Sequence, residues 1–119
     1  MDLTVFNGSF YTYKVKDLDG VDFSAPFVFV AKTDRELSVV CQTPPAHPTA
    51  REGPFAALRV EGILDFSLTG ILAKLTEALA KAGIPVFALS TFDTDYLLVR
   101  ENTLAAAKQA LEQAGYRFV

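Results

Sequence analysis

The second half of the chain predicts an α+β fold, and three patterns support this prediction. Residues 67–82 and 103–114 place apolar residues at helical spacing, and a glycine follows each segment. Two nearly continuous apolar runs, residues 86–90 and 96–99, lie between those segments and are typical of central strands. Residues 58–62 predict a strand before the first helical segment, and residues 116–119 predict a strand after the second. The resulting order of strand, helix, strand, strand, helix, strand is typical of a ferredoxin-like fold.

The first 41 residues predict strands and no helix of useful length. Residues 3–6 and 10–15 flank an Asn-Gly pair, and we expect a two-residue hairpin there because both positions accept positive φ. Residues 27–31 and 37–41 are rich in β-branched and other apolar side chains, so they predict two further strands.

A proline-rich connector follows. Residues 42–54 contain four of the six prolines of the chain, and proline removes a backbone donor and fixes φ. We therefore expect this segment to hold neither strand nor helix, and to close an N-terminal unit of residues 1–54 ahead of a C-terminal domain at residues 55–119. His47, the only histidine, lies in the connector and is expected to be a solvated loop residue.

The two predicted helices are amphipathic and can pack on one face of the sheet. The first, residues 67–82, has Ser67 as its natural N-cap, although Asp65 could serve, and Gly83 predicts its end. The second begins at Asn102 or Thr103. The residues expected to face the sheet are Leu68, Leu72, Leu75, Leu79 and Ala82 in the first helix, and Leu104, Ala107, Leu111 and Ala114 in the second.

Composition excludes several classes of function. The net charge is −3 and the basic residues are dispersed, which argues against a nucleic-acid or anionic-membrane partner. Cys41 is the only cysteine, so an intramolecular disulfide is impossible and a zinc site is not expected. The N-terminus does not resemble a signal peptide, and no apolar run approaches the roughly 18 residues of a membrane span. We expect a cytoplasmic protein without a metal or cofactor.

Two blocks of the chain match a known pattern, VEGILDFSLTG at residues 60–70 and AGIPVFALSTFDTDYLLV at residues 82–99. Together they resemble the ACT-domain family. More narrowly, they are similar to small bacterial proteins related to the ACT domains of aspartokinases and of the eukaryotic cytosolic arginine sensors. Residues 27–40 are similar to the first half of the same subfamily. The resemblance implies a degenerate, strand-rich ACT-like unit at residues 1–54 beside an ACT domain at residues 55–119, and amino-acid binding at a domain interface.

Gly70 has two interpretations. It lies in the expected first turn of the helix, where alanine would be more favourable by about 1 kcal/mol. The glycine either permits close packing of the helix start against a strand, or lets a ligand approach the free backbone N–H groups of residues 68–70. A helix N-terminus attracts anions such as an amino acid's carboxylate, and the resemblance favours the ligand. The candidate ligand-binding residues at this end are Asp65, Phe66, Ser67, Leu68, Thr69 and Gly70.

The turn between the two central strands also carries candidate residues. Asp93 and Asp95 either cap the turn or hold the ammonium or guanidinium group of a ligand. Two carboxylates favour a basic side chain, so lysine and arginine rank first among possible ligands, and neutral amino acids remain open. The candidate ligand-binding residues in this turn are Ser90, Thr91, Asp93, Thr94 and Asp95.

These observations predict an amino-acid-binding regulatory or sensor module without catalytic activity. The alternative is a structural ACT-like module that serves dimerisation and binds no ligand. A small enzyme is the third possibility, but the sequence contains no nucleophile–base pair, phosphate-binding glycine loop or metal-ligand spacing. A homodimer is expected, because half of the residues are hydrophobic and a patch can remain exposed.

Overall fold

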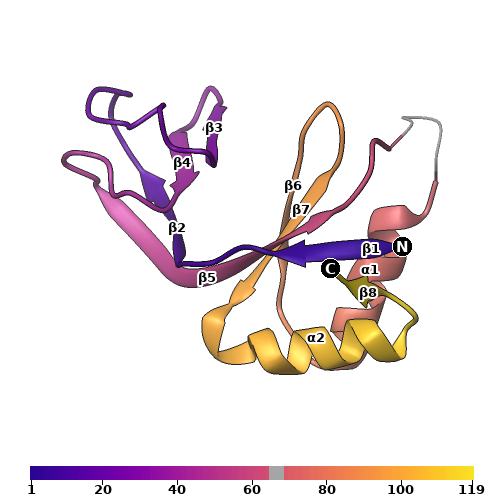
Figure 1. The fold of residues 1–119 in the computed structure, drawn as a ribbon. Helices are drawn as coiled ribbons and strands as arrows, with labels where there is room; N and C mark the ends of the chain where they lie inside the picture. The colour runs from indigo at the N-terminus through magenta and orange to yellow at the C-terminus, as the bar shows by residue number, and fades with distance from the viewer. Residues whose placement is uncertain (65–68) are drawn as a thin grey trace. The chain divides into compact units, whose positions relative to one another are not determined.

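The structure, a computed structural model, describes residues 1–64 and 69–119 (Figure 1). The described residues form two compact units. The larger unit consists of residues 1–7 and 56–119, and the smaller unit consists of residues 8–55.

The larger unit has the predicted order of strand, helix, strand, strand, helix, strand. Its elements are β5 (Ala50–Val60, shared with the smaller unit), α1 (Ile71–Lys81), β6 (Phe87–Ser90), β7 (Asp95–Arg100), the 3-10 turn η1 (Glu101–Thr103), α2 (Leu104–Gln113) and β8 (Arg117–Phe118). One additional strand, β1 (Asp2–Val5), completes a sheet of order β6-β7-β5-β1-β8. The ferredoxin-like α+β fold class is therefore confirmed.

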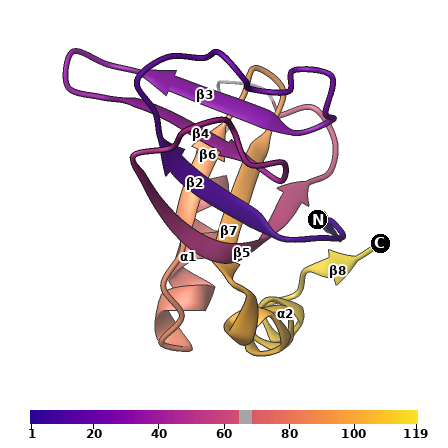
Figure 2. The same ribbon diagram turned by 90° about the vertical axis from the view of Figure 1, so that its left-hand side faces the viewer.

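Both helices of the larger unit pack on one hydrophobic core and lie next to each other (Figures 1 and 2). Each fully buried leucine stabilises the fold by about 1.5–3 kcal/mol. Within the described part of the chain, neither helix has the length and apolar character needed to cross a bilayer. The core residues are Leu75 and Leu79 from α1, Ala107 and Leu111 from α2, and Leu3, Ala56, Leu58, Val60, Leu97 and Val99 from the strands, together with Ile84.

The predicted end of the first helix is confirmed. Gly83 follows the last helical turn with a φ of 73°, which glycine adopts without steric cost. Its N–H donates to the Ala80 carbonyl oxygen at 3.0 Å, and the Ile84 N–H donates to the Leu79 carbonyl oxygen at 3.0 Å. These bonds satisfy carbonyl groups at the helix end and turn the chain toward β6.

The predicted hairpin around Asn7 and Gly8 is wrong. β1 pairs antiparallel with β5, with Leu3 opposite Val60, and parallel with β8. A two-residue turn of the expected type needs positive φ at both central positions, but only Gly8 of this pair has it, at 88°. Because β1 lies between β5 and β8, Leu3 is fully buried in the core of the larger unit. Burial by distant strands therefore decides where β1 pairs, and the local turn signal does not.

The smaller unit is a sheet of β2 (Phe10–Lys14), β3 (Val28–Lys32), β4 (Leu37–Cys41) and the first part of β5, in the order β3-β4-β2-β5. All of residues 8–55 are described and none lies in a helix, in agreement with the strand-rich prediction. Its core cluster contains the buried residues Tyr13, Val15, Val39 and Cys41.

The expectation that residues 42–54 hold no strand is wrong for their last five residues, because β5 begins at Ala50 and pairs with β2. The prolines do not prevent this pairing. The register shifts between Phe10 and Thr12, so that Gly53 and Pro54 lie at an irregularity of the ladder. A proline at such a bulge costs no ladder hydrogen bond.

Candidate functional site

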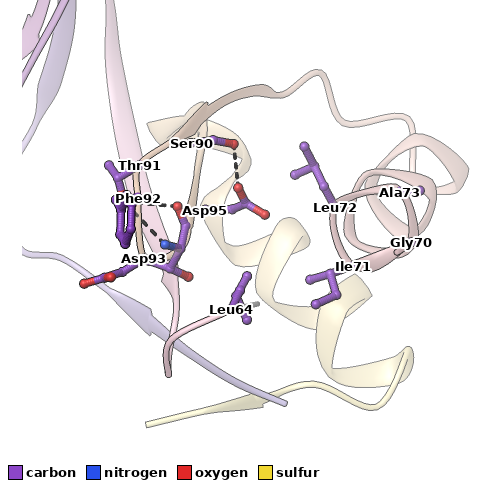
Figure 3. Close-up of a pocket in the computed structure, with 11 residues that line it drawn as sticks. Leu64, Gly70, Ile71, Leu72, Ala73, Ser90, Thr91, Phe92, Asp93 and Asp95 are labelled. Carbon is purple, nitrogen blue, oxygen red and sulfur yellow. Dashed lines mark hydrogen bonds between the residues drawn. The ribbon is translucent and has the colours of Figure 1, made fainter. Parts of the chain in front are cut away.

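A cavity of about 410 Å³ opens between the start of α1 and the turn that joins β6 to β7 (Figure 3). The turn contributes residues 90–95, the helix start contributes residues 70–73, and Leu64 adds an apolar side chain. Ile71 and Leu72 point into the space between helix and turn. All of these residues belong to the larger unit.

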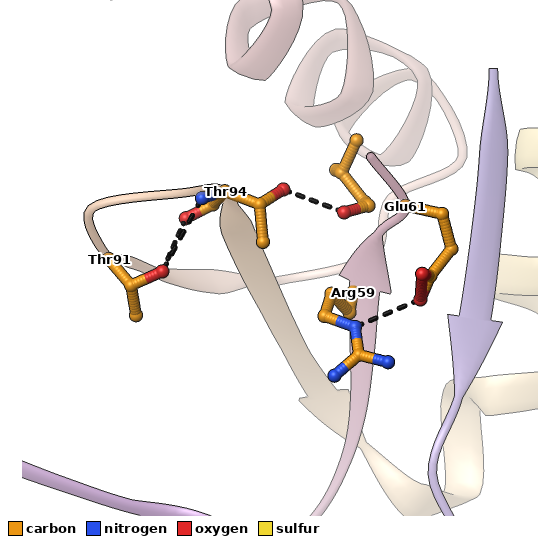
Figure 4. A network of polar contacts seen from close by, with 5 residues as sticks. Arg59, Glu61, Thr91 and Thr94 are labelled. Carbon is orange, nitrogen blue, oxygen red and sulfur yellow. Dashed lines mark hydrogen bonds and ion pairs between the residues drawn. The ribbon is translucent and has the colours of Figure 1, made fainter. Parts of the chain in front are cut away.

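Hydrogen bonds fix the shape of the turn. The Thr91 N–H and hydroxyl both donate to the Thr94 carbonyl oxygen, at 2.9 and 3.2 Å. Thr94 is only 7% exposed, and its hydroxyl donates to the Val60 carbonyl oxygen of β5 at 2.6 Å (Figure 4). The Leu64 N–H donates to the Asp93 carbonyl oxygen at 2.7 Å. The turn is therefore tied both to β5 and to the segment that follows β5.

The two aspartates of the turn point in different directions (Figure 3). Asp95 accepts a hydrogen bond from the Ser90 hydroxyl at 2.5 Å, and its carboxylate points across the cavity toward α1. Asp93 is exposed, and its carboxylate points away from α1. The sequence treats the two residues alike, but their directions give them different chemistry, and Asp95 is the acid that faces the helix start.

The helix begins later than predicted. Its first residue is Ile71, and its N-cap is Gly70 in the left-handed conformation with a φ of 77°. Gly70 is therefore not in the first turn, and the first helical hydrogen bond runs from the Lys74 N–H to the Gly70 carbonyl oxygen at 3.0 Å. The predicted N-caps, Ser67 and Asp65, lie outside the described residues. Glycine suits this position because the left-handed region costs other residues roughly 1–2 kcal/mol.

A methyl group at Gly70 would have no atom of the described residues within 4 Å. The first interpretation of this glycine, close packing against a neighbouring strand, is therefore wrong for the described part of the chain. The open space beside Gly70 is consistent with the second interpretation, access to the helix start. That access remains a prediction as far as a ligand is concerned.

The start of α1 presents a partial positive charge to the cavity. The first N–H groups of the helix belong to Ile71, Leu72 and Ala73, which all line it. Gly70 has no side chain to cap them, and the first turn contains no acidic residue. The N–H groups expected to act, those of residues 68–70, are thus displaced by one turn along the chain. An anionic group is favoured at such a terminus, and the Asp95 carboxylate on the opposite wall favours a cation.

The structure brings together six of the eleven candidate residues, because Gly70, Ser90, Thr91, Asp93, Thr94 and Asp95 all line this cavity. Thr69 lines a separate cavity of about 210 Å³ together with Gly70 and Lys74. Asp65, Phe66, Ser67 and Leu68 lie outside the described residues. Sequence reasoning missed the lining residues Leu64, Ile71, Leu72, Ala73 and Phe92. The shifted helix start explains three of these omissions.

Glu61, which directly follows β5, forms an ion pair with Arg59. The Arg59 Nε donates to the Glu61 Oε1 at 2.9 Å (Figure 4), and the guanidinium group lies 4.8 Å from the centre of the Phe6 ring. The hydrogen bond from Arg59 lowers the pKa of Glu61 below its ordinary value. Glu61 therefore has its cation within the protein. Among residues 1–64 and 69–119, no group of three His, Cys, Asp or Glu residues is placed to hold a metal ion.

Comparison with known proteins identifies several similar chains. The family model described as ACT domain matches residues 51–113, and no curated protein matches. A crystal structure of an Agobacterium tumefaciens protein is 31% identical with a TM-score of 0.84, covering 99% of this chain and 91% of that chain.

Two more distant structures show the same fold. A Vibrio cholerae protein of unknown function, described as a possible transport protein, is 17% identical with a TM-score of 0.76 and coverages of 95% and 88% of this chain and of that chain. The ligand-free regulatory subunit of aspartate kinase from Thermus thermophilus is 12% identical with a TM-score of 0.61 and coverages of 93% and 97%.

Proposed function

The chain belongs to the ACT-domain family, and we propose that it is an amino-acid-binding regulatory or sensor module without catalytic activity. ACT domains are generally regulatory modules that bind amino acids. The observation that carries the proposal is the cavity in which the uncapped start of α1 faces the Asp95 carboxylate. Its two walls carry opposite charge, as do the two ends of an amino acid's main chain.

In the proposed complex, the α-carboxylate accepts hydrogen bonds from the N–H groups of residues 71–73, and the α-ammonium group binds Asp95. The Ser90 hydroxyl holds the Asp95 carboxylate in place through its 2.5 Å hydrogen bond. An amino acid has about ten heavy atoms, and the best small ligands gain at most about 1.5 kcal/mol per atom. A micromolar Kd needs about 8 kcal/mol, so such affinity is physically allowed.

The side chain of the ligand is the second part of the proposal. Asp93 lies on the same turn and lines the same cavity, but its carboxylate points away from α1. It can therefore attract the distal charge of a long basic side chain while Asp95 binds the main-chain ammonium group. We rank lysine and arginine first for this reason, ahead of neutral amino acids.

The alternative proposal is a ligand-free interaction module, and one observation favours it. Ile63 and Phe92 are 80% and 82% exposed. The residues that follow them in sequence, Leu64 and Asp93, are joined by a hydrogen bond from the Leu64 N–H to the Asp93 carbonyl oxygen. Exposed apolar side chains of this size are typical of surfaces that contact another protein. The homodimer, the cytoplasmic location and the degenerate ACT-like nature of residues 1–54 stay predictions under either proposal.

A thermal-shift screen of the full chain against the twenty amino acids tests the proposal. A ligand at one hundred times its Kd adds about 2.7 kcal/mol to the free energy of unfolding. For 119 residues this raises Tm by roughly 10 °C. If no amino acid at millimolar concentration raises Tm, the ligand-free alternative replaces the proposal.

A matched pair of variants tests the site. Asp95→Asn keeps the size of the side chain but removes its charge, and we expect it to weaken binding by about 10- to 100-fold, as for loss of one charged hydrogen bond. Asp93→Asn is the control. It should leave the affinity for neutral amino acids unchanged and weaken only that for lysine and arginine. Equal binding by the Asp95→Asn variant and the unmodified protein would place the site elsewhere.

A further inference from the structure

β3 is the outer strand of the smaller unit, and its pairing with β4 determines which backbone groups point outward. The two strands pair from Val28 opposite Cys41 to Lys32 opposite Leu37. Just beyond them, the Thr33 N–H donates to the Glu36 carbonyl oxygen at 2.9 Å. Hydrogen-bonded and non-bonded pairs alternate along an antiparallel ladder. The N–H and C=O groups of every second residue of β3 therefore point away from β4, and these residues are Val28, Val30 and Lys32.

These outward groups have no protein partner among residues 1–64 and 69–119. The sheet ends at β3 on this side, and no described residue donates a hydrogen bond to them or accepts one from them. Most of the usual features that protect an outer strand are missing as well. β3 contains no proline, its register with β4 is continuous, and its only charged residue is Lys32 at the end.

Val30 makes this edge apolar. It lies on the same face of the sheet as Val28 and as Val39, its partner in β4, and both of those residues belong to the core cluster or pack against it. Val30 itself is nevertheless 40% exposed. Burying the exposed part of Val30 against another apolar side chain would therefore be favourable.

We propose that the β3 edge binds β3 of a second copy of this chain, antiparallel and with a twofold axis at Val30. In this register Val30 faces its own copy and Val28 faces Lys32 of the partner. Each of the three facing pairs exchanges two hydrogen bonds, which gives six across the interface. When the twofold axis passes between two copies of the same residue that hydrogen-bond to each other, the N–H and C=O groups of that residue must point outward from the strand. Val30, the middle residue of the five in β3, meets that requirement.

This self-complementarity favours a second copy over an unrelated peptide, because one sequence supplies both halves of the register. The inference rests on the homodimer predicted from the sequence but is independent of amino-acid binding. β6 is one of the two outer strands of the larger unit and offers a matched comparison. It is shorter, with four residues, and two of them, Ala88 and Ser90, are exposed.

A charge exchange at Val30 tests the twofold register. In Val30→Lys and Val30→Glu, like charges face each other across the axis, and each variant alone should associate at least about tenfold more weakly than the unmodified protein. Mixing the two variants places opposite charges face to face and should restore the dimer. Sedimentation velocity of the full chain measures all three samples, and circular dichroism confirms that each variant is folded.

Ala88→Lys is the control and should remain dimeric. The inference is overturned if the unmodified protein is monomeric at millimolar concentration, or if Val30→Lys dimerises as the unmodified protein does. It is also overturned if the mixture of Val30→Lys and Val30→Glu stays monomeric. Loss of the dimer in Ala88→Lys alone would assign the contact to β6. None of these outcomes depends on the thermal-shift result with amino acids, so the two proposals fail separately.

Discussion

Replacing Thr94 with valine should destabilise the larger unit through one hydrogen bond. The Thr94 hydroxyl is buried and donates to the Val60 carbonyl oxygen at 2.6 Å. Valine has nearly the same shape but cannot donate, so the carbonyl oxygen loses this partner. Leaving a buried polar group unsatisfied costs about 1–3 kcal/mol. Unfolding entropy of about 2.1 cal/mol/K per residue then gives a fall in Tm of roughly 4–12 °C for 119 residues.

Two further variants isolate the hydroxyl group. Thr94→Ser keeps the donor and removes one methyl group, so its cost should stay near 0.8 kcal/mol, about the value of one buried CH₂. Thr91→Val removes the hydroxyl that donates to the Thr94 carbonyl oxygen, but that oxygen keeps its hydrogen bond from the Thr91 N–H, so the variant should cost no more than about 1 kcal/mol. Urea unfolding followed by circular dichroism measures all three. The reasoning is refuted if Thr94→Val is as stable as Thr94→Ser.

Two other predictions concern titratable groups. Arg117 donates two hydrogen bonds to the Asp2 carboxylate, at 2.9 and 3.1 Å, and these lower the pKa of Asp2 below its ordinary value of 3.8. The resulting stabilisation is complete above that value and is lost as pH falls through the lowered pKa. Arg117→Gln should therefore reduce the dependence of the urea midpoint on pH below about pH 4 and leave its dependence on pH near neutrality unchanged. Cys41 is 2% exposed and burial raises the pKa of its thiol, so a thiol reagent at pH 8 should label it at least about a hundredfold more slowly in the folded protein than in urea. Equal rates would show that β4 opens freely.

The helices and their C-terminal ends were predictable because their sequence signals are local. The apolar stripe through Leu75 and Leu79 and the glycine that follows residue 82 fix the packing face and the end of α1 without reference to the rest of the chain. The helix start was not predictable in the same way. Ser67 is the better N-cap by residue type, but the helix starts after Gly70, which has a positive φ that glycine adopts without steric cost.

The strand errors share one physical cause. Asn7 and Gly8 form a strong local turn signal, and the prolines before residue 55 are a strong local signal against a strand. Both signals are overridden because β5, with eleven residues, offers pairing partners to β1 and β2 in different parts of its length. Register with a distant strand is not encoded in any short window.

The candidate site was predictable as a pair of segments but not as a geometry. The sequence identified the helix start and the turn at residues 90–95, and the structure shows that both line one cavity. It could not separate Asp93 from Asp95, because the difference lies in the direction of each side chain. That direction follows from the hydrogen bonds of the turn, including the bond from Ser90 to Asp95.

The position of β1 has a consequence for the order in which the protein can fold during synthesis. β1 is made before the other strands of this fold, yet one of its neighbours is β8 (Arg117–Phe118) and the other is the end of β5. Contacts between residues so far apart in sequence form slowly, because a long loop must close first. The four strand segments of the smaller unit, residues 8–55, are all synthesised long before β8. Its sheet can therefore form on the nascent chain, while the side of β1 that pairs with β8 stays unpaired until β8 has been made.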